Sequence, residues 1–194
     1  MNFELNEEQS ALSESLSRLL ADRYGFEKRG ALVAAGRKDD ADTWKQLAEL
    51  GLTALPLPEA HGGFGGGARD LLPVLQALGR SLALEPFLAS AVLGSAAVRL
   101  AGDDEVQSRV LPEAASGEAI LAWAHDEPGG RHAPLWVETR AERKNGRWVL
   151  DGAKSTVLAA GLARHVVVSA RVSGKPGDAD GCALFLLDPR ADGV

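Results

Sequence analysis

The residues best suited to chemistry lie in one irregular segment, 124–132, which reads Ala-His-Asp-Glu-Pro-Gly-Gly-Arg-His. This segment gathers acidic, basic and glycine residues between an apolar, strand-like run and a predicted hairpin. Arg131 stands where glycines open the backbone, so a phosphate or carboxylate can approach its guanidinium. His125 is a candidate ligand contact, although a histidine beside Asp126 in a loop is often only a surface residue. We therefore expect a site loop here.

A β-hairpin and further strands follow this loop. Residues 136–142 alternate polar and apolar, and Asn145-Gly146 then turns the chain into the run 147–150. Asn-Gly between two such runs predicts a type I′ turn, because that turn needs positive φ at both central residues. The rest of this half is predicted to contain a short strand over 151–158, an apolar strand over 165–170, a mobile loop over 174–181 and a buried strand over 183–187.

The first half of the chain is predicted to be helical. Asn6, with Gln9 three residues on, predicts a capping box that begins a helix ending near Arg23. Other helices are expected over 42–50, 70–82 and 87–100, and in a short segment after Asp103. We therefore expect an α+β fold, with a helical domain over 1–117 and a β domain over 118–194.

A glycine-rich stretch precedes the helix predicted over 70–82. Residues 63–68 formally match G-x-G-x-x-A, the dinucleotide fingerprint in which glycines admit a pyrophosphate to a helix N-terminus. Prolines at 56 and 58 disrupt the strand that this motif requires before it, and no second βαβ unit follows. We interpret the stretch as a tight connection in which glycine lets two helices pack closely.

Composition argues against several classes of function. The 194 residues carry a net charge of −6 and no basic stripe, which argues against nucleic-acid binding. The N-terminus lacks a secretory signal and no apolar run is long enough to cross a membrane, so we expect a cytoplasmic protein. His132 and His165 have no carboxylate at a ligand-like helical spacing, which argues against a metal site. Cys182 lies in an apolar run and is expected to be a small buried residue.

The predicted β part is small for an independent domain. Its few strands leave bare sheet edges, which natural proteins avoid. We therefore expect the chain to be part of something larger or to need a partner.

The order and spacing of several short motifs resemble the N-terminal half of the acyl-CoA dehydrogenase family. These motifs are Asn6-Glu7-Glu8-Gln9, Pro58-Glu59 followed by Gly62-Gly63, the run 120–129, and Gly146-x-Trp148-x-Leu150-x-Gly152-x-Lys154. Together they cover the whole chain. A further likeness, to the divergent small subunits of heteromeric members such as pimeloyl-CoA dehydrogenase, lies in residues 24–26, 62–67 and 127–131.

The resemblance implies a helical N-terminal domain, an antiparallel, β-barrel-like middle domain that is incomplete here, and a C-terminal four-helix bundle that is absent. It implies FAD as cofactor and an acyl-CoA as substrate, which is oxidised to a trans-2-enoyl-CoA while FAD accepts the hydride. In the family a glutamate on the bundle removes the α-proton, so this piece alone is expected to be inactive and to hold no catalytic residue. Electron-transfer flavoprotein or a similar carrier is the implied acceptor.

Three functions stay open at this point. The chain can be part of a dehydrogenase that works as a homo- or hetero-oligomer. It can instead be a non-catalytic partner that completes or stabilises a homologous catalytic subunit. A helical scaffold with a β interaction module and no redox role is the third. The yellow colour of bound flavin distinguishes the three. A dehydrogenase should be yellow, a partner subunit should be yellow only when its partner is present, and a scaffold should stay colourless.

By the same resemblance, two segments are expected to contact FAD. The first is the flavin-side strand, and the second stands where the family has Trp-Ile-Thr, so the stacking tryptophan is missing. The expected FAD contacts are Trp123, Ala124 and His125 in the first segment, and Thr156, Val157 and Leu158 in the second. Packing alone also accounts for Trp123, which alternates with core residues.

The expected substrate contacts lie in the site loop. They are Glu127, Gly130 and Arg131, with Arg131 facing a CoA phosphate or a substrate carboxylate. The family's Gly-Ser-Asp is absent after Gly130, which removes a hydroxyl contact. Lys154, after a tight turn, is expected to form a surface ion pair.

Overall fold

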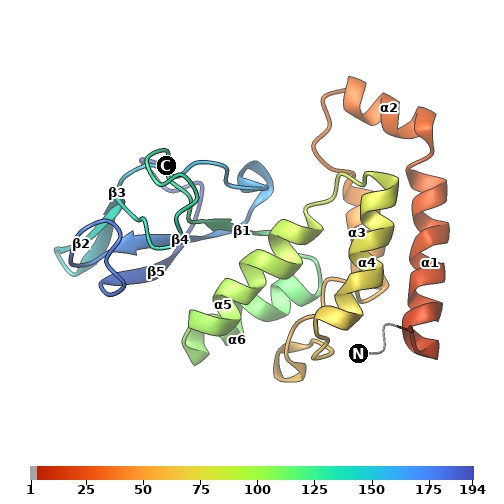
Figure 1. Cartoon of the computed structure of the whole chain (residues 1–194), viewed down its shortest axis with the longest axis horizontal. Coiled ribbons are helices and arrows are strands. Elements are labelled where there is room, and N and C mark those ends of the chain that lie inside the picture. The colour runs from red at the N-terminus through yellow and green to blue at the C-terminus, as the bar shows by residue number, and fades with distance from the viewer. Residues whose placement is uncertain (1–3) are drawn as a thin grey trace.

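The computed structural model describes residues 4–194 and divides them between a helical half and a sheet half (Figure 1). Helices occupy the chain up to residue 115, and strands follow from residue 121. Helices α5 and α6 lie between the other helices and strand β1. The predicted α+β class, with helices first and a partial sheet second, is confirmed.

Most helices of the first half begin and end near the predicted positions, but the helix over residues 26–34 was not predicted. The Asn6 side chain accepts a hydrogen bond from the Gln9 amide, and the Gln9 side chain accepts one from the Asn6 amide, which is the predicted capping box. Gly51 follows α3 with a φ of 75°, and Asp103 caps α6. The elements are α1 (Glu7–Arg23), α2 (Phe26–Ala34), α3 (Ala41–Glu49), the 3-10 helix η1 (Glu59–His61), α4 (Ala68–Ser81), the π-helical segment η2 (Leu88–Gly94), α5 (Ser95–Ala101) and α6 (Asp104–Ala115).

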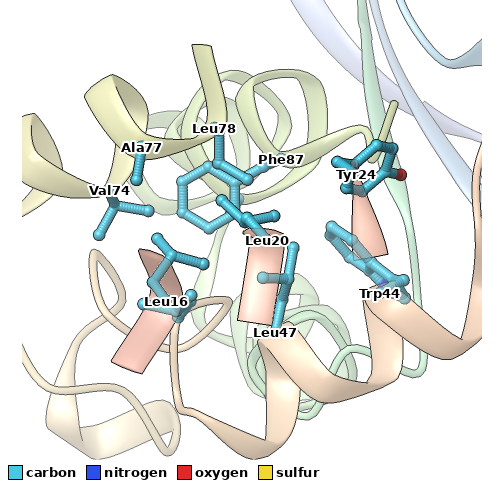
Figure 2. Packing of buried hydrophobic residues seen from close by; sticks show 11 residues of the cluster. Leu16, Leu20, Tyr24, Trp44, Leu47, Val74, Ala77, Leu78 and Phe87 are labelled. Atoms are coloured by element: carbon cyan, nitrogen blue, oxygen red, sulfur yellow. The ribbon is translucent and has the colours of Figure 1, made fainter. Parts of the chain in front are cut away.

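The helical core lies between α1, α3 and α4 (Figure 2). Leu16 and Leu20 of α1 are buried there because residues four apart share one face of a helix. Trp44 and Leu47 of α3 face the same core, as predicted. The Trp44 Nε1–H also donates to the Gly117 carbonyl at 2.8 Å, which ties the helical core to the entry of the sheet half.

A second apolar cluster joins the helices to the sheet. Val98 of α5 and Leu111 of α6 pack in it with Leu121 of β1 and Val167 of β4. Gly94 permits this contact, because a Cβ at that position would lie 2.6 Å from the Leu121 Cβ. The strands nearest the helices are therefore held against them by a buried interface.

Strand β4 is the centre of the sheet. The elements of this half are β1 (Leu121–Ala124), β2 (Arg140–Lys144), β3 (Arg147–Asp151), the 3-10 helix η3 (Ala160–Leu162), β4 (His165–Arg171) and β5 (Cys182–Leu187). Strand β5 runs antiparallel to β4 along one edge, whereas β1 runs parallel to it along the other. The β2–β3 hairpin joins β4 only through the pair Arg140 and Arg171. The sheet is thus mixed rather than purely antiparallel.

The predicted hairpin is present but shorter than expected. Asn145 and Gly146 have φ values of 51° and 80°, as a type I′ turn requires. The first strand begins at Arg140 and not at residue 136. The amides of Glu138 and Thr139 donate instead to the Glu127 carboxylate, so they are not available to a neighbouring strand.

The predicted strand over 151–158 is wrong beyond its first residue. Strand β3 ends at Asp151, and the chain then turns irregularly. The Ser155 amide donates to the Asp126 carbonyl at 2.8 Å, and Thr156 has a φ of 53°, which no strand accommodates. Two sequence segments are thereby drawn together without strand pairing.

The glycines of the glycine-rich connection allow its own backbone segments to pack closely, rather than allowing two helices to approach each other. A Cβ on Gly63 would lie 2.0 Å from the Leu57 carbonyl oxygen, and the Gly65 amide donates to that same oxygen at 2.7 Å. Asp70 occupies the start of α4, where its carboxylate accepts from the Gly67 amide at 2.8 Å. An acid at that helix N-terminus, with the loop amides already paired, agrees with the rejection of a phosphate loop.

Two other expectations for the sheet half are corrected. The Arg171 side chain is fully buried and donates to the carbonyl oxygens of Asp178 and Asp180, so the loop over 174–181 is held rather than loose. Cys182 is exposed and not buried, because it is the first residue of β5 and lies at the open end of that strand.

Candidate functional site

A cavity of about 200 Å³ opens between η2, the end of β1 and the segment after β3. We call it the smaller cavity. Its lining residues are Ala89, Leu93, Trp123, His125, Asp126, Thr156 and Leu158. Four of them, Trp123, His125, Thr156 and Leu158, come from the two segments predicted to contact one cofactor. The structure therefore brings these two segments to a common surface.

The other two predicted cofactor contacts do not line the smaller cavity. Ala124 is buried among Ala122, Val166 and Val168 on the opposite face of the strand. Val157 packs against that same cluster and lines a second cavity. Only a backbone contact to a ligand remains open to Ala124.

Trp123 and His125 form one aromatic wall of the smaller cavity. Their rings are stacked, with centroids 5.4 Å apart and planes inclined by 6°. They share a face because residues two apart in an extended chain point the same way. The His125 Nε2 lies 3.0 Å from the Pro134 carbonyl oxygen, and Nδ1 lies 2.9 Å from the Ser169 hydroxyl. The imidazole is thus held from both sides.

Lys154 lies next to this histidine, and all three N–H donors of its ammonium group have a partner. Its Nζ donates to the Glu127 carboxylate at 2.7 Å, to the Ser169 hydroxyl at 3.0 Å and to the His125 carbonyl at 3.1 Å. Since a carbonyl oxygen only accepts, Nε2 of His125 carries the proton toward Pro134. Ser169 accepts from Lys154 and so donates its own proton to Nδ1. The network fixes both the tautomer and the orientation of His125.

Glu127 is the buried anchor of this network. Its carboxylate also accepts from the Glu138 amide and from the amide and hydroxyl of Thr139. Burial favours the neutral acid, but the hydrogen bonds from Lys154 and Thr139 outweigh it and lower the pKa of Glu127 from 4.5 to about 2. The side chains of Lys154 and Glu127 are only 9% and 1% exposed, so the predicted surface ion pair is a buried one. The oxygens of the Glu127 carboxylate are used in these internal hydrogen bonds, and a contact of Glu127 with substrate stays a prediction.

Thr156 reaches the cavity through an unusual backbone conformation. Its φ of 53° lies in the left-handed region, which is sterically unfavourable for a β-branched residue. Its hydroxyl forms no hydrogen bond within residues 4–194. Strained backbone persists where surrounding structure enforces it, and such strain clusters at ligand sites. Here the Lys154 network and the bond from Ser155 to Asp126 enforce it.

The remaining predicted substrate residues lie outside the smaller cavity. Gly130 is buried in the turn that follows Glu127, where its amide donates to the Glu127 carbonyl at 3.0 Å. Arg131 is exposed and has a φ of 47°. Its neighbour His132 pairs with Asp126 at 2.8 Å. The structure thus leaves the Arg131 guanidinium at the surface, and its role as an anion contact stays a prediction.

A larger cavity of about 430 Å³ adjoins the smaller one. The two share Ala89 and Leu158 as lining residues. It is lined by Lys38, Leu84, Glu85, Pro86, Leu88, Ala89 and residues 157–162. Most of the residues that line it are of apolar type, and the charged ones are Lys38 and Glu85.

Sequence reasoning missed several residues of the two cavities. Ala89 and Leu93 are ordinary members of an apolar helix and carry no signal of their own. Asp126 has no signal in the sequence beyond its place next to His125. Glu85 did carry a signal, because it is a lone acid between an apolar run and the helix that begins after Pro86.

Comparison with known proteins shows the family to which this chain belongs. A model of the acyl-CoA dehydrogenase N-terminal domain matches residues 6–118, more than half of the chain. The chain belongs to the acyl-CoA dehydrogenase family. The resemblance drawn from the sequence motifs is therefore confirmed.

The relatives of this acyl-CoA dehydrogenase family member are longer than the chain itself. It is 28% identical to the probable acyl-CoA dehydrogenase YngJ of Bacillus subtilis, over 97% of this chain and 50% of that protein. It is 26% identical to benzylmalonyl-CoA dehydrogenase of Aromatoleum aromaticum, over 100% of this chain and 50% of that protein. The chain spans about half the length of the curated relatives it matches.

Solved structures of the family show the same fold. A chain of the ChsE4-ChsE5 complex from Mycobacterium tuberculosis superposes with a TM-score of 0.84 at 27% identity, covering 100% of this chain and 50% of that one. A Tcur3481-Tcur3483 steroid ACAD variant gives a TM-score of 0.82 at 30% identity, over 96% of this chain and 49% of that one. Within residues 4–194, no helix has the length and apolarity to cross a bilayer. The same residues contain no group of three or more His, Cys, Asp or Glu side chains suited to a metal ion.

Proposed function

We propose that this chain forms the helical and β parts, residues 1–117 and 118–194, of a flavin-dependent acyl-CoA dehydrogenase. The reaction is the oxidation of an acyl-CoA to its trans-2-enoyl-CoA. The observation that carries the proposal is the meeting of Trp123, His125, Thr156 and Leu158 around one cavity in a chain of this family. We place one edge of the FAD ring system in the smaller cavity and the acyl group in the larger one beside it.

The residues present fit one edge of a flavin. The stacked rings of Trp123 and His125 offer a flat aromatic wall, and the free hydroxyl of Thr156 can hydrogen-bond a heteroatom of the ring. A cavity of about 200 Å³ is too small for a whole FAD molecule, which agrees with a cofactor shared with another part of the protein. When bound, FAD supplies the hydride acceptor of the reaction.

The chain's own residues position the cofactor and substrate rather than perform the proton transfer. Lys154 and Ser169 hold His125 in one tautomer, so the wall behind the cofactor is preorganised. The carboxylate that lines the smaller cavity belongs to Asp126, and it is already paired with His132 at 2.8 Å. We therefore place the base that removes the α-proton on the part of the protein that this chain does not contain.

Partners follow from the same proposal. The second half of the enzyme comes from a C-terminal region or from another subunit, and electron-transfer flavoprotein or a similar carrier accepts the electrons. We further propose a cytoplasmic, oligomeric enzyme. Bare edges at β3 and β5 support association, because unpaired strand edges are normally covered.

A second candidate function is that of a partner subunit that stabilises a homologous catalytic one. It is favoured by the likeness to a chain of the ChsE4-ChsE5 complex, an assembly of two named components. The absence of the family's stacking tryptophan at residues 156–158 supports it as well. Under this alternative the flavin and the base both belong chiefly to the other subunit.

Purification through an affinity tag on this chain, from cells that encode it, tests the proposal. The isolated protein is assayed for flavin absorbance and, with acyl-CoA esters and an artificial electron acceptor, for enoyl-CoA by mass spectrometry. We expect flavin and enoyl-CoA. Residues 1–194 expressed alone serve as the control and are expected to be colourless and inactive. A tagged assembly that holds flavin but forms no enoyl-CoA contradicts the proposed reaction, and one without flavin contradicts both candidates.

A further inference from the structure

Asp126 places a carboxylate beside the smaller cavity. Among the described residues that line this cavity, Asp126 is the only acid, and His125 is the only other ionisable residue. Asp126 Oδ2 lies 2.8 Å from His132 Nδ1, and the two side chains are 34% and 79% exposed. Histidine is the side chain that ordinarily changes its charge between pH 5 and 8. The carboxylate at the edge of the cavity therefore has a partner that can gain or lose a positive charge.

The other charges around Asp126 are paired or screened. The Lys154 ammonium donates to the His125 carbonyl, next to Asp126 in the chain, but the buried Glu127 carboxylate balances its charge. Both ring nitrogens of His125 already have a partner. Two further charged side chains near this loop are exposed, where water and salt screen them: Arg131 and Glu138. The net charge beside the cavity thus depends chiefly on whether the Asp126 carboxylate is balanced.

A charge at this position acts on a bound flavin without touching it. Coulomb energy falls only with the first power of distance, so it extends across several ångströms. Hydride transfer to a flavin adds one negative charge to its ring system. A nearby carboxylate disfavours that added charge, and a protonated imidazole paired with the carboxylate offsets the effect. The charge on His132 would therefore favour the reduced flavin over the oxidised one.

We propose that Asp126 and His132 together set the reduction potential of the bound flavin, and that His132 makes their contribution depend on pH. This inference rests on the proposed function, which places one edge of FAD in the smaller cavity. The Asp126 carboxylate weakens the binding of reduced flavin relative to oxidised flavin. His132 cancels this effect in acid, where it carries a proton, and loses the ability as pH rises.

The substitution Asp126→Asn removes the charge and keeps the shape of the side chain. The reduction potential of FAD in the tagged assembly described above is measured at pH 8.5 against a reference dye. Binding of reduced flavin relative to oxidised flavin is expected to improve about threefold, because a charge some ångströms away in a water-rich setting is worth that ratio. For a two-electron couple this is a rise of about 14 mV. Asp192→Asn, at an exposed position, is the matched control and should leave the potential unchanged.

The substitution His132→Gln removes the titrating group and keeps a side chain that can donate to Asp126. At pH 6 the potential is expected to lie about 14 mV below that of the wild type, which again corresponds to a factor of about three. At pH 8.5 the two potentials should agree, because His132 is then neutral. Comparing the two proteins at each pH cancels the titration of His125 and of the flavin itself. His61→Gln, in η1, is the matched control and should follow the wild type at both pH values.

The outcomes separate the two proposals. An unchanged potential in Asp126→Asn overturns this inference and leaves the proposed function standing. A shift in His132→Gln that is equal at the two pH values overturns it as well, since a purely structural role would give that result. If Asp126→Asn loses its flavin, the comparison of His132→Gln with the wild type decides alone. If the wild-type assembly holds no flavin, the proposed function fails and this inference fails with it.

Discussion

Lys154 Nζ lies 2.7 Å from the Glu127 Oε1, and both side chains are almost completely withdrawn from solvent. This pair connects the loop after β1 to the segment after β3, which the sheet itself leaves unpaired. It brings Thr156 to the same cavity as Trp123 and His125. The shape of the smaller cavity therefore depends on one buried ion pair whose members lie far apart in the sequence.

Removing the ammonium group should damage both stability and the cavity. Lys154→Met leaves Glu127 buried without its counterion and frees Ser169, and breaking such a pair costs about 3–5 kcal/mol. Urea unfolding is expected to show a loss of that order. Lys45→Met, which removes an exposed ammonium near Glu49, is the control and should cost about 0.5 kcal/mol or less. Equal losses in the two variants would show that Lys154 has no special role.

The low pKa of Glu127 makes stability depend on acid. The folded pKa of about 2 lies below the ordinary 4.5, so the ionised carboxylate stabilises the fold above pH 4.5, and this contribution is lost as pH falls toward 2. The shift corresponds to about 3 kcal/mol. The difference in unfolding free energy between wild type and Glu127→Gln should be constant above pH 4.5 and shrink below it. Asp70 and Asp188, whose pKa values are also lowered, titrate in both proteins and cancel. A difference independent of pH over this range would refute the assignment.

The backbone of Thr156 is expected to be strained, because its left-handed conformation is what brings the residue to the cavity. Thr156→Gly relieves the left-handed conformation, and after the entropy cost of glycine it should raise stability by about 0.5–1 kcal/mol. Ser155→Gly, one residue earlier at ordinary φ, should lower stability by about 0.5–1 kcal/mol. Thermal unfolding of the two variants compares them directly. Loss of stability in Thr156→Gly would mean that no strain is stored there.

The glycine-rich connection gives a test of the fold that is independent of the site. Gly63→Ala would place a Cβ 2.0 Å from the Leu57 carbonyl oxygen, so the loop must shift or open. We expect a loss of about 1–3 kcal/mol in urea unfolding. Gly30→Ala, in α2 with open space around it, is expected to be neutral or to stabilise by up to about 1 kcal/mol. An equal response at both glycines would contradict the packed loop.

Local signals in the sequence were sufficient for most elements of the fold. The capping box of Asn6 and the Asn145-Gly146 turn are decided by neighbouring residues, and both appear as predicted. The order of the motifs also indicated the family correctly. Predicted strand bounds were wrong where a distant side chain takes the backbone hydrogen bonds that a neighbouring strand would need. Glu127 does this with the amides of Glu138 and Thr139.

The site was predictable in outline and not in detail. Two segments expected to meet a cofactor do meet at one cavity, because the family motifs fix their order. The burial of Lys154 and Glu127 could not be read from the sequence, since a lysine after a turn is ordinarily exposed. The hydrogen bond from Tyr24 to Glu85 also joins residues far apart in the sequence. Such relationships exist only in three dimensions.

A variant that fills the smaller cavity should weaken the binding of FAD, because we place one edge of the flavin there. Leu93 lines the smaller cavity and is partly exposed, so Leu93→Trp adds bulk there at little expected cost to the fold. Leu100→Trp, at an exposed position at the end of α5, is the matched control. FAD is removed from each tagged assembly and titrated back by fluorescence quenching. We expect FAD affinity to fall about tenfold or more in Leu93→Trp and to stay unchanged in Leu100→Trp. Unchanged FAD affinity in a folded Leu93→Trp assembly would show that the flavin does not occupy the smaller cavity.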